Sequence, residues 1–283
     1  MISIVIVTFN SRDSLKNCLE SIFRQALRNM EVVVVDNGSQ DGTIDLIKRQ
    51  YGQVRLVENA ENVGSCKARN QGLEFVSGEW VLTLDSDVVL EDGCLECFVA
   101  CLDRVREDVG MVQPQVFGMD GETIYSNGIY LSAWKRFFDM NRGRQAKAGL
   151  TVHGIIGPCS AAAFYRRSML EQLKESTGYF DERFFFLVED VDLAWRACRR
   201  GWRTAFYPAI ICRHKGNGSG TDKDLRQYLS FRNRRLMILK NTGVLERFML
   251  YLISWPYELS RSIYMRCSNR FMRHGGSLLQ RGG

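Results

Sequence analysis

One apolar run that leads directly into two acids is the strongest constraint on how this chain folds. Trp80 to Leu84 are large or β-prone residues, and Asp85 and Asp87 follow them. A near-continuous apolar run between Gly78 and a pair of acids predicts a buried strand of a parallel sheet. Ligands of open α/β sheets bind just beyond the carboxyl ends of such strands. We therefore expect both acids at the ligand-binding edge of the sheet.

This stretch alone leaves two interpretations of the acids open. Two hard oxygen ligands one residue apart suit Mg²⁺ or Mn²⁺ bound together with the phosphates of a substrate, because Mg²⁺ rarely uses a cage made of protein ligands alone. Aspartate and serine also end strands and cap the helices that follow them. A polar turn is therefore the alternative to a metal site.

The same succession of strand and helix runs through the first part of the chain. Apolar runs predict strands, and segments with helical periodicity separate them. The expected strands are Ile2 to Thr8, Glu31 to Asp36, Val54 to Val57, Trp80 to Asp85 and Gly110 to Phe117, and the expected helices are 11–23, 43–51, 64–75 and 90–105. This alternation predicts an α/β fold with a mostly parallel sheet flanked by helices.

Beyond Gly118 the alternation gives way to loops and short strands, and it resumes near Val152. Small residues from Gly157 to Ala163 would let a substrate or another backbone approach closely. Further strands are expected around 204–207 and before His214.

The end of the chain differs from the rest in charge and pattern. We expect a body of residues 1–222, with halves at about 1–117 and 118–222, and a basic amphipathic helical extension over 223–283. Residues 225–283 hold eleven Lys and Arg against two Glu, a balance of +9, whereas residues 1–224 hold 27 basic and 30 acidic residues, a balance of −3. A basic helix with interleaved aromatic residues suits the surface of an anionic membrane. Packing of these aromatic residues on the body or in a homodimer is the alternative, and no nucleic-acid partner is expected, since no recognised binding motif accompanies the arginines.

The remaining composition predicts a cytoplasmic protein. The longest lipophilic run, Phe248 to Trp255, is far too short to span a membrane, and the N-terminal apolar run has no basic leader and therefore predicts a strand and not a signal peptide. Cys94, Cys97 and Cys101 would fall on one face of a helix without a second Cys pair or a nearby His. We interpret them as free thiols that act as small hydrophobes, not as zinc ligands.

A third group of acids comes late in the chain. Glu189, Asp190 and Asp192 open an expected helix directly after the aromatic run Phe184 to Leu187. Acids commonly complement the dipole at a helix N-terminus, and this accounts for one or two of them. An apolar wall also desolvates a carboxylate and raises its pKa toward the range of a general base.

In chain order, these motifs resemble a known family. They are Thr8-Phe9-Asn10, Asp36-Asn37-Gly38-Ser39, Asn62-x-Gly64 with Ala68-Arg69-Asn70, Asp85-x-Asp87, Glu189-Asp190 and His214. The set resembles the inverting glycosyltransferases of family 2, and within them the rhamnosyltransferase-like branch of bacterial polysaccharide synthesis. The resemblance covers about residues 1–240. It implies a GT-A fold, a nucleotide-sugar donor, a divalent metal (Mg²⁺ or Mn²⁺), and a glycan or polyprenyl-linked acceptor at the inner face of the cytoplasmic membrane.

The resemblance also implies roles for individual residues. Asp190 would be the catalytic base, and Asp87 and His214 would hold the metal and the diphosphate. The residues expected to bind substrate are Thr8, Asn10, Asp36, Asn62, Arg69, Asp85, Gly157, Glu189 and Lys215. Within that set, Thr8, Asp36 and Arg69 would surround the base and ribose of the donor, and the run from Gly157 to Ala162 would floor the acceptor pocket. Apart from the resemblance, Lys215 and the glycine-rich 216–220 segment could close over the phosphates, but a plain flexible loop is the favoured interpretation of so short a glycine pattern.

Two other classes remain as alternatives. A sugar nucleotidyltransferase would also need two carboxylates and a metal, but it usually has a basic, Gly-rich loop after the first strand, where this chain has Asn10-Ser11-Arg12-Asp13. A non-catalytic nucleotide- or sugar-binding module would not need an acid in an aromatic pocket as well as a metal pair. The Gln-x-x-Arg-Trp motif of processive synthases is missing, so addition of a single sugar is expected.

Overall fold

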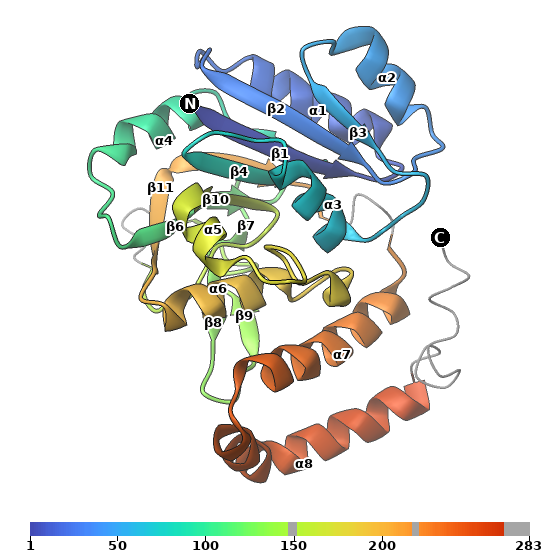
Figure 1. Ribbon diagram of the computed structural model, residues 1–283, viewed down its shortest axis with the longest axis vertical. Helices are drawn as coiled ribbons and strands as arrows, with labels where there is room; N and C mark the ends of the chain where they lie inside the picture. The colour runs from blue at the N-terminus through green and yellow to red at the C-terminus, as the bar shows by residue number, and fades with distance from the viewer. Residues whose placement is uncertain (147–151, 217–220, 269–283) are drawn as a thin grey trace.

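The computed structural model describes residues 1–146, 152–216 and 221–268. A mixed sheet of nine strands runs through it in the order β3-β2-β1-β4-β10-β6-β11-β5, with β7 beside β6 (Figure 1). The strands of this sheet are β1 (Ile2–Thr8), β2 (Met30–Asp36), β3 (Arg55–Glu58), β4 (Trp80–Asp85), β5 (Val88–Leu90), β6 (Val109–Phe117), β7 (Ile124–Ser126), β10 (Ala162–Arg166) and β11 (Arg203–His214). A separate hairpin pairs β8 (Ile129–Leu131) with β9 (Phe137–Asp139).

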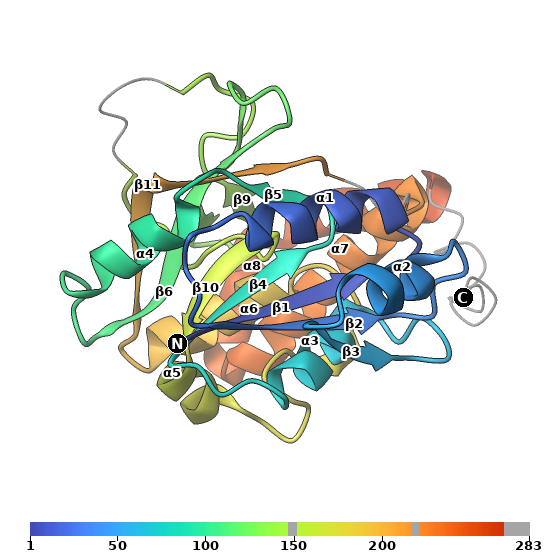
Figure 2. The same ribbon diagram turned by 90° about the horizontal axis from the view of Figure 1, so that it is seen from above.

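Helices cover both faces of the large sheet. They are α1 (Arg12–Phe23), α2 (Thr43–Gln50), α3 (Ser65–Leu73), α4 (Cys94–Leu102), α5 (Arg167–Leu173), α6 (Glu189–Arg199), α7 (Lys223–Asn241), α8 (Val244–Ser268) and the short 3₁₀ helix η1 (Glu182–Phe184). α1, α2 and α4 pack on one face, and α3, α5 and α6 pack on the other (Figures 1 and 2). Successive residues of β1 serve both cores, since Ile4 and Ile6 face the first set of helices and Val5 faces the second.

The strand directions confirm the expected α/β fold. β3, β2, β1 and β4 pair in parallel, and β6 pairs in parallel with β11. β10 runs antiparallel to both β4 and β6, so those two strands point the same way. The register places Thr8 opposite Asp36 and Val7 opposite Asp85. The polar residues that end these strands therefore meet at one edge, as the sequence predicts.

Two expected elements differ in detail. The two strands expected around 204–207 and before His214 are one strand, β11, whose pairing with β6 is irregular between Tyr207 and Ile211. Pro208 lies in this irregularity, because proline has no N–H to donate to the ladder. The helix expected from Leu90 begins at Cys94, and Leu90 itself ends β5.

The two C-terminal helices pack below the second face. α7 buries Leu229, Met237 and Ile238 against α6 and η1, and α8 lies against α7 (Figure 1). Among the described residues, no helix combines the length and the apolar content that crossing a membrane requires.

Candidate active site

A pocket of about 520 Å³ opens at the sheet edge where β1 and β4 end. It brings together most of the residues that the sequence singles out. These are Thr8, Asn62, Arg69, Asp85, Asp87, Glu189, Asp190 and His214. They come from separate parts of the chain, so the fold, and not local sequence, creates the site.

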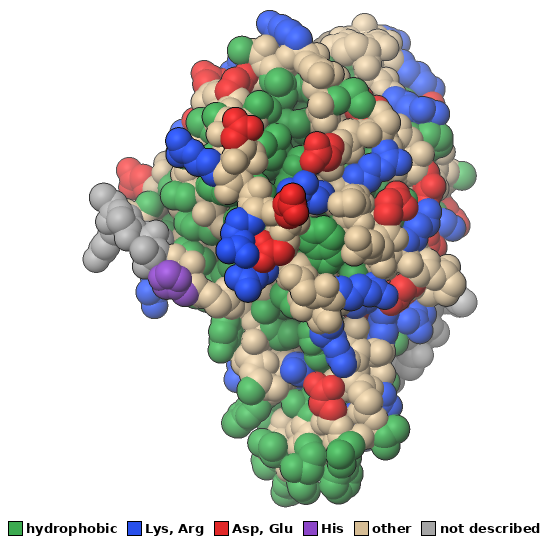
Figure 3. Space-filling view, turned by 60° about the vertical axis from the view of Figure 1, so that its left-hand side comes forward, with side chains coloured by type: hydrophobic (Ala, Val, Ile, Leu, Met, Phe, Trp, Pro, Cys, Tyr) green, Lys and Arg blue, Asp and Glu red, His purple; other side chains and the backbone are tan. Residues whose placement is uncertain are grey.

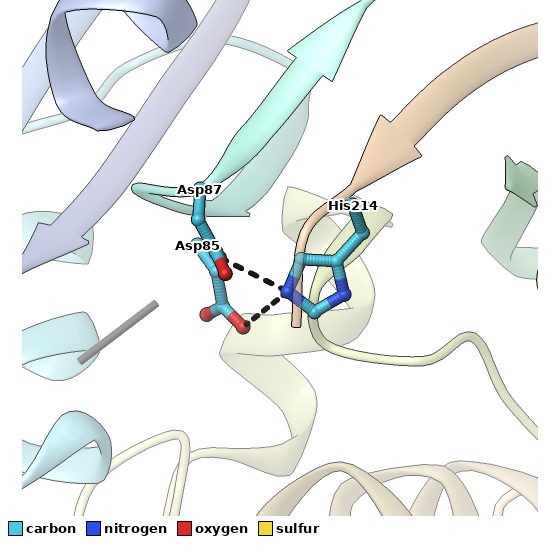
Figure 4. Close-up of side chains that lie close together, drawn as sticks. All are labelled: Asp85, Asp87 and His214. Carbon is cyan, nitrogen blue, oxygen red and sulfur yellow. Dashed lines mark hydrogen bonds and ion pairs between the residues drawn. The ribbon is translucent and has the colours of Figure 1, made fainter. Parts of the chain in front are cut away.

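Asp85, Asp87 and His214 form a cluster that fits a divalent cation. One ligand atom from each lies within 4.8 Å of the others (Figure 4). The His214 Nε2 is 3.0 Å from Asp87 Oδ1 and 3.9 Å from Asp85 Oδ2. Two carboxylates and an imidazole are a donor set that Mg²⁺ and Mn²⁺ accept. These residues therefore fit the metal that the resemblance implies.

Strand pairing explains why His214 lies beside acids 127 residues away in sequence. β11 ends antiparallel to the short strand β5, with His214 opposite Val88, directly after Asp87. The ring of Tyr125 packs against the imidazole at 4.3 Å between centroids, nearly edge-on. Arg142 stacks over Tyr125 and bonds Asp139, and these three residues continue the pocket wall beyond the cluster.

Arg69 connects Asp85 of the Asp85–Asp87–His214 cluster to Glu189 at the start of α6. Its guanidinium donates to Asp85 Oδ1 and to Glu189 Oε1, both at 2.6 Å, and it is 1% exposed. Burial alone would lower the pKa of Arg69, but the charges of Asp85 and Glu189 raise it, so the side chain stays cationic. Asp85 therefore turns one oxygen toward Arg69 and the other toward His214. Glu74, the residue that follows α3, pairs with Lys174 and not with Arg69.

Asp190 has the environment of a base that works near neutral pH. Burial, and then the charge of the neighbouring Glu189, raises the pKa of Asp190 to about 7. The backbone N–H of Ser160 donates to one carboxylate oxygen at 3.1 Å, and that of Val191 donates to the other at 2.8 Å. Asp192 differs, because it is buried and paired with Arg196 of the same helix and with Lys240 of α7.

The segment 184–188, which we call the strap, walls the pocket just before these acids. Three of its residues have the left-handed backbone that non-glycine residues rarely adopt: Phe185, Leu187 and Val188, with φ of 65°, 69° and 75°. Such residues cost about 1–3 kcal/mol each and persist where the surroundings hold them. The amide of Asn233, which is fully buried on α7, donates to three carbonyl groups of the strap at 2.8–2.9 Å. Asn233 therefore fixes the wall of the pocket.

Four residues expected to bind substrate lie outside the lining: Asn10, Asp36, Gly157 and Lys215. Asp36 is buried and accepts bonds from the backbone of the turn that follows β2, and Asn10 accepts from Gln40 at the surface. A Cβ at Gly157 would lie 2.2 Å from the Cβ of Ala194, so this glycine permits close packing of α6 and does not floor the pocket.

The rest of the expected acceptor floor is partly present. Cys159, Ser160 and Ala161 do line the pocket. Lys215 is exposed, and residues 217–220 of the glycine-rich segment expected over the phosphates lie outside the described residues.

Several pocket residues carry no sequence signal that we used. The side chain of Asn233 bonds backbone carbonyls, and the backbone N–H of Ser160 bonds Asp190. Bonds that use backbone groups depend little on residue type and so leave no sequence motif. α7, assigned to the extension, lines the pocket with Leu225, Arg226 and Leu229. Cys94, Cys97 and Cys101 lie on α4, with Cys94 buried and the other two half-buried.

Comparison with known proteins identifies two similar mycobacterial enzymes. The N-acetylglucosaminyl-diphospho-decaprenol L-rhamnosyltransferase of Mycobacterium tuberculosis (strain ATCC 25618 / H37Rv) is 26% identical over 256 residues, which cover 78% of each chain. The PGL/p-HBAD biosynthesis glycosyltransferase of Mycobacterium bovis (strain BCG / Pasteur 1173P2) is 26% identical over 275 residues, which cover 94% of this chain and 95% of that protein.

Solved structures show the same architecture. TarS of S. aureus, residues 1–349, gives a TM-score of 0.59 at 19% identity and covers 95% of this chain and 74% of its own. The mannosyltransferase PcManGT from Pyrobaculum calidifontis, solved with GDP-Man and Mn²⁺, gives 0.57 at 19% identity and covers all of this chain and 75% of its own. The chain therefore has the GT-A fold.

The family model described as Glycosyl transferase family 2 matches residues 3–174, which contain β1 to β4 and the two aspartates of the metal cluster. More than half of the chain is covered by this match, and the chain belongs to glycosyl transferase family 2.

Proposed function

We propose that this protein transfers one sugar, a hexosyl or rhamnosyl residue, from a nucleotide-sugar donor to an acceptor hydroxyl with inversion at the anomeric carbon. The observation that carries the proposal is a single pocket that holds both a cluster fit to bind a metal and a half-buried carboxylate, Asp190, whose pKa is raised to about 7. Departure of a nucleoside diphosphate needs its charge neutralised, and attack by a hydroxyl needs a base. The pocket supplies groups for both.

The metal side of the reaction depends on Asp87 and His214. Mg²⁺ or Mn²⁺ held there would act as a Lewis acid toward the leaving diphosphate. Asp85 adds a carboxylate oxygen whose position is fixed by Arg69. Thr8 and Arg69, which line the pocket, would contact the base and ribose of the donor together with Asp36, and Asn62, also in the lining, would bind substrate.

Asp190 would accept the proton of the acceptor hydroxyl. The two backbone N–H groups that bond its carboxylate hold it in one orientation. Its raised pKa keeps proton transfer favourable near neutral pH, because the best general bases have pKa values close to the working pH. One base and one assisted leaving group are enough for a single displacement, which inverts the anomeric carbon.

The acceptor side is proposed from the relatives and from the charge of the chain. The similar M. tuberculosis enzyme is named for a decaprenol-linked substrate. We infer a glycan or polyprenyl-linked acceptor, and action at the inner face of the cytoplasmic membrane, to which the basic C-terminal region would be attracted. Residues 1–222 would form the catalytic domain, with a donor half near 1–117 and an acceptor half near 118–222, and 223–283 the extension, from which α7 contributes to the pocket wall.

Turnover of nucleotide sugars tests the function directly. With Mn²⁺ present, we expect slow release of nucleoside diphosphate from the correct donor and faster release when a suitable acceptor is added. A thermal-shift screen identifies the base beforehand, because a ligand that binds the native state raises the melting temperature. Net synthesis of a nucleotide sugar from a sugar phosphate would favour the nucleotidyltransferase alternative, and binding without turnover of any donor would favour the binding module.

The assignment of the metal ligands gives a separate prediction. Asp87→Ala and His214→Ala should each weaken the metal-dependent binding of nucleoside diphosphate by at least about tenfold, since even loss of a group that only supports a ligand costs this much. Titration calorimetry with and without Mn²⁺ measures the effect. Asp92→Ala and His153→Ala, which change exposed residues outside the pocket, are the matched controls. Unchanged metal linkage in both site variants would refute the assignment.

A further inference from the structure

α8 turns apolar side chains to the surface along one side. Leu245, Phe248, Leu252, Trp255, Leu259 and Ile263 recur every three or four residues and are 50–74% exposed. Figure 3 shows hydrophobic side chains gathered at the end of the molecule where α8 lies. Contiguous exposed apolar surface of this kind marks an interaction site on a soluble protein.

Four charged residues of α8 contact the body or α7: Glu246, Arg247, Glu258 and Arg261. Glu258 pairs with the buried Arg234 of α7. Arg261 stacks over Phe231 of α7, and Glu246 pairs with Lys135 and Arg199. In an ordinary surface helix the apolar side faces the body and the charges face water. α8 instead has apolar residues on both sides: Leu250 and Met265 are buried, and a second set of apolar side chains remains exposed on the outer side, where the described body does not cover it.

We propose that this outer side of α8 is a membrane-docking surface that lies in the interface of an anionic bilayer. The exposed apolar residues of α8 named above, which we call the stripe, run along one side of the helix without a charged residue between them on that side. The stripe extends about 30 Å, a length that suits a helix lying along the bilayer surface. The charge of the chain favours a lipid surface over a second copy of the same chain. Residues 225–283 have a balance of +9 against −3 for the rest, and both of their acids are already paired with arginine or lysine.

The β8–β9 hairpin connects this surface to the pocket. At its tip, Arg136 stacks over Tyr257 of α8, and the carbonyl of Lys135 accepts from Arg234. At its other end, Phe138 and Asp139 line the pocket. α8 on a bilayer therefore places the acceptor side of the pocket close to the lipid surface. This last step rests on the proposed lipid-linked acceptor, whereas the contact with the bilayer does not.

The test compares two double variants of the full chain for binding to vesicles. Phe248→Gln with Leu252→Gln removes two side chains of the stripe while keeping good helix formers. Val99→Gln with Met119→Gln removes two exposed apolar side chains elsewhere and is the matched control. The probe is phosphatidylglycerol-containing vesicles, with pure phosphatidylcholine vesicles as the neutral reference, and sedimentation measures the bound fraction.

The wild type and the control should bind the anionic vesicles at low salt and more weakly at high salt or on neutral vesicles. The stripe variant should bind at least about tenfold more weakly, because each lost side chain removes a large share of the buried apolar area. Tryptophan fluorescence should shift to shorter wavelength on binding, and Trp255→Phe should remove most of that shift, because the other four tryptophans lie outside α8. Equal binding of the two double variants overturns the proposal.

Size-exclusion chromatography with light scattering tests whether a second copy of the chain, and not a bilayer, covers the stripe. A dimer that the stripe variant abolishes, together with no binding to vesicles, would overturn the proposal in favour of a contact between copies. Turnover with a short, soluble acceptor reports on the proposed function alone. A protein that binds vesicles through α8 but transfers no sugar would refute the function and leave the docking surface standing.

Discussion

Asp190→Asn should lower the rate of sugar transfer by about 10²- to 10⁴-fold, the usual contribution of a general base. Asparagine cannot accept the proton of the acceptor hydroxyl. Binding of nucleoside diphosphate with metal should stay close to wild type, because Asp85, Asp87 and His214 lie at the ends of β4 and β11 and in the turn after β4, whereas Asp190 lies on α6. Initial rates with donor and acceptor, together with calorimetry for the nucleotide, measure the two effects separately.

Asp92→Asn, an exposed acid outside the pocket, is the control for this substitution. Each oxygen of Asp190 accepts a backbone N–H, so asparagine loses one of these bonds, and thermal melting checks that the fold survives. Retention of more than about a tenth of wild-type turnover, which lies outside the range for loss of a base, would move the role to another acid.

The pH profile gives the same prediction without a mutation. Burial and Glu189 raise the pKa of Asp190 to about 7, so the carboxylate loses its proton only as the pH rises through that value. The transfer rate should therefore fall as the pH drops below about 7. For stability the sign is opposite, because a raised folded-state pKa favours the protonated form. This contribution of Asp190 is fully present below its unfolded pKa and is lost as the pH rises through about 7.

Much of the fold follows from local patterns in the sequence. Apolar runs predict β1, β2 and β4 within one residue, because strands buried on both faces leave a continuous signal. The direction of β10 does not follow, since periodicity is the same in parallel and antiparallel strands. The exposed apolar side of α8 does not follow either, because an apolar pattern in sequence does not state whether it faces the body or the surroundings.

The site is predictable where it lies at strand ends and less so elsewhere. Asp85 and Asp87 follow a strand, and the ends of parallel strands meet at one edge. The partners of Arg69 are 16 and 120 residues away, and no spacing rule connects them. The resemblance suggests an acceptor role for Gly157, but small size fits a substrate and a neighbouring backbone equally well, and here it serves the packing of α6. Residues that bond backbone groups, such as Asn233, cannot be predicted from sequence motifs.

Arg69→Met should lower the free energy of unfolding by about 3–5 kcal/mol, the usual cost of breaking a buried ion pair by removing one partner. Glu189 is 2% exposed, and without the guanidinium its carboxylate would be a buried charge with no cation beside it. Asp85 would lose the bond that fixes it next to His214, so metal-dependent nucleotide binding should weaken as well. Urea denaturation measures the first effect, and calorimetry with Mn²⁺ measures the second.

Two further variants test whether the loss of stability comes from the buried charge of Glu189 or simply from the loss of a salt bridge. Lys174→Met breaks the exposed pair with Glu74 and should cost at most about 1 kcal/mol. Adding Glu189→Gln to Arg69→Met removes the uncompensated charge and should restore part of the stability, because the penalty comes from the charge left behind and not from the pair itself. The metal linkage should stay weak in this double variant, since Asp85 still lacks its partner. If Arg69→Met were no less stable than Lys174→Met, the buried ion pairs of Arg69 with Asp85 and Glu189 would not stabilise the pocket as we expect.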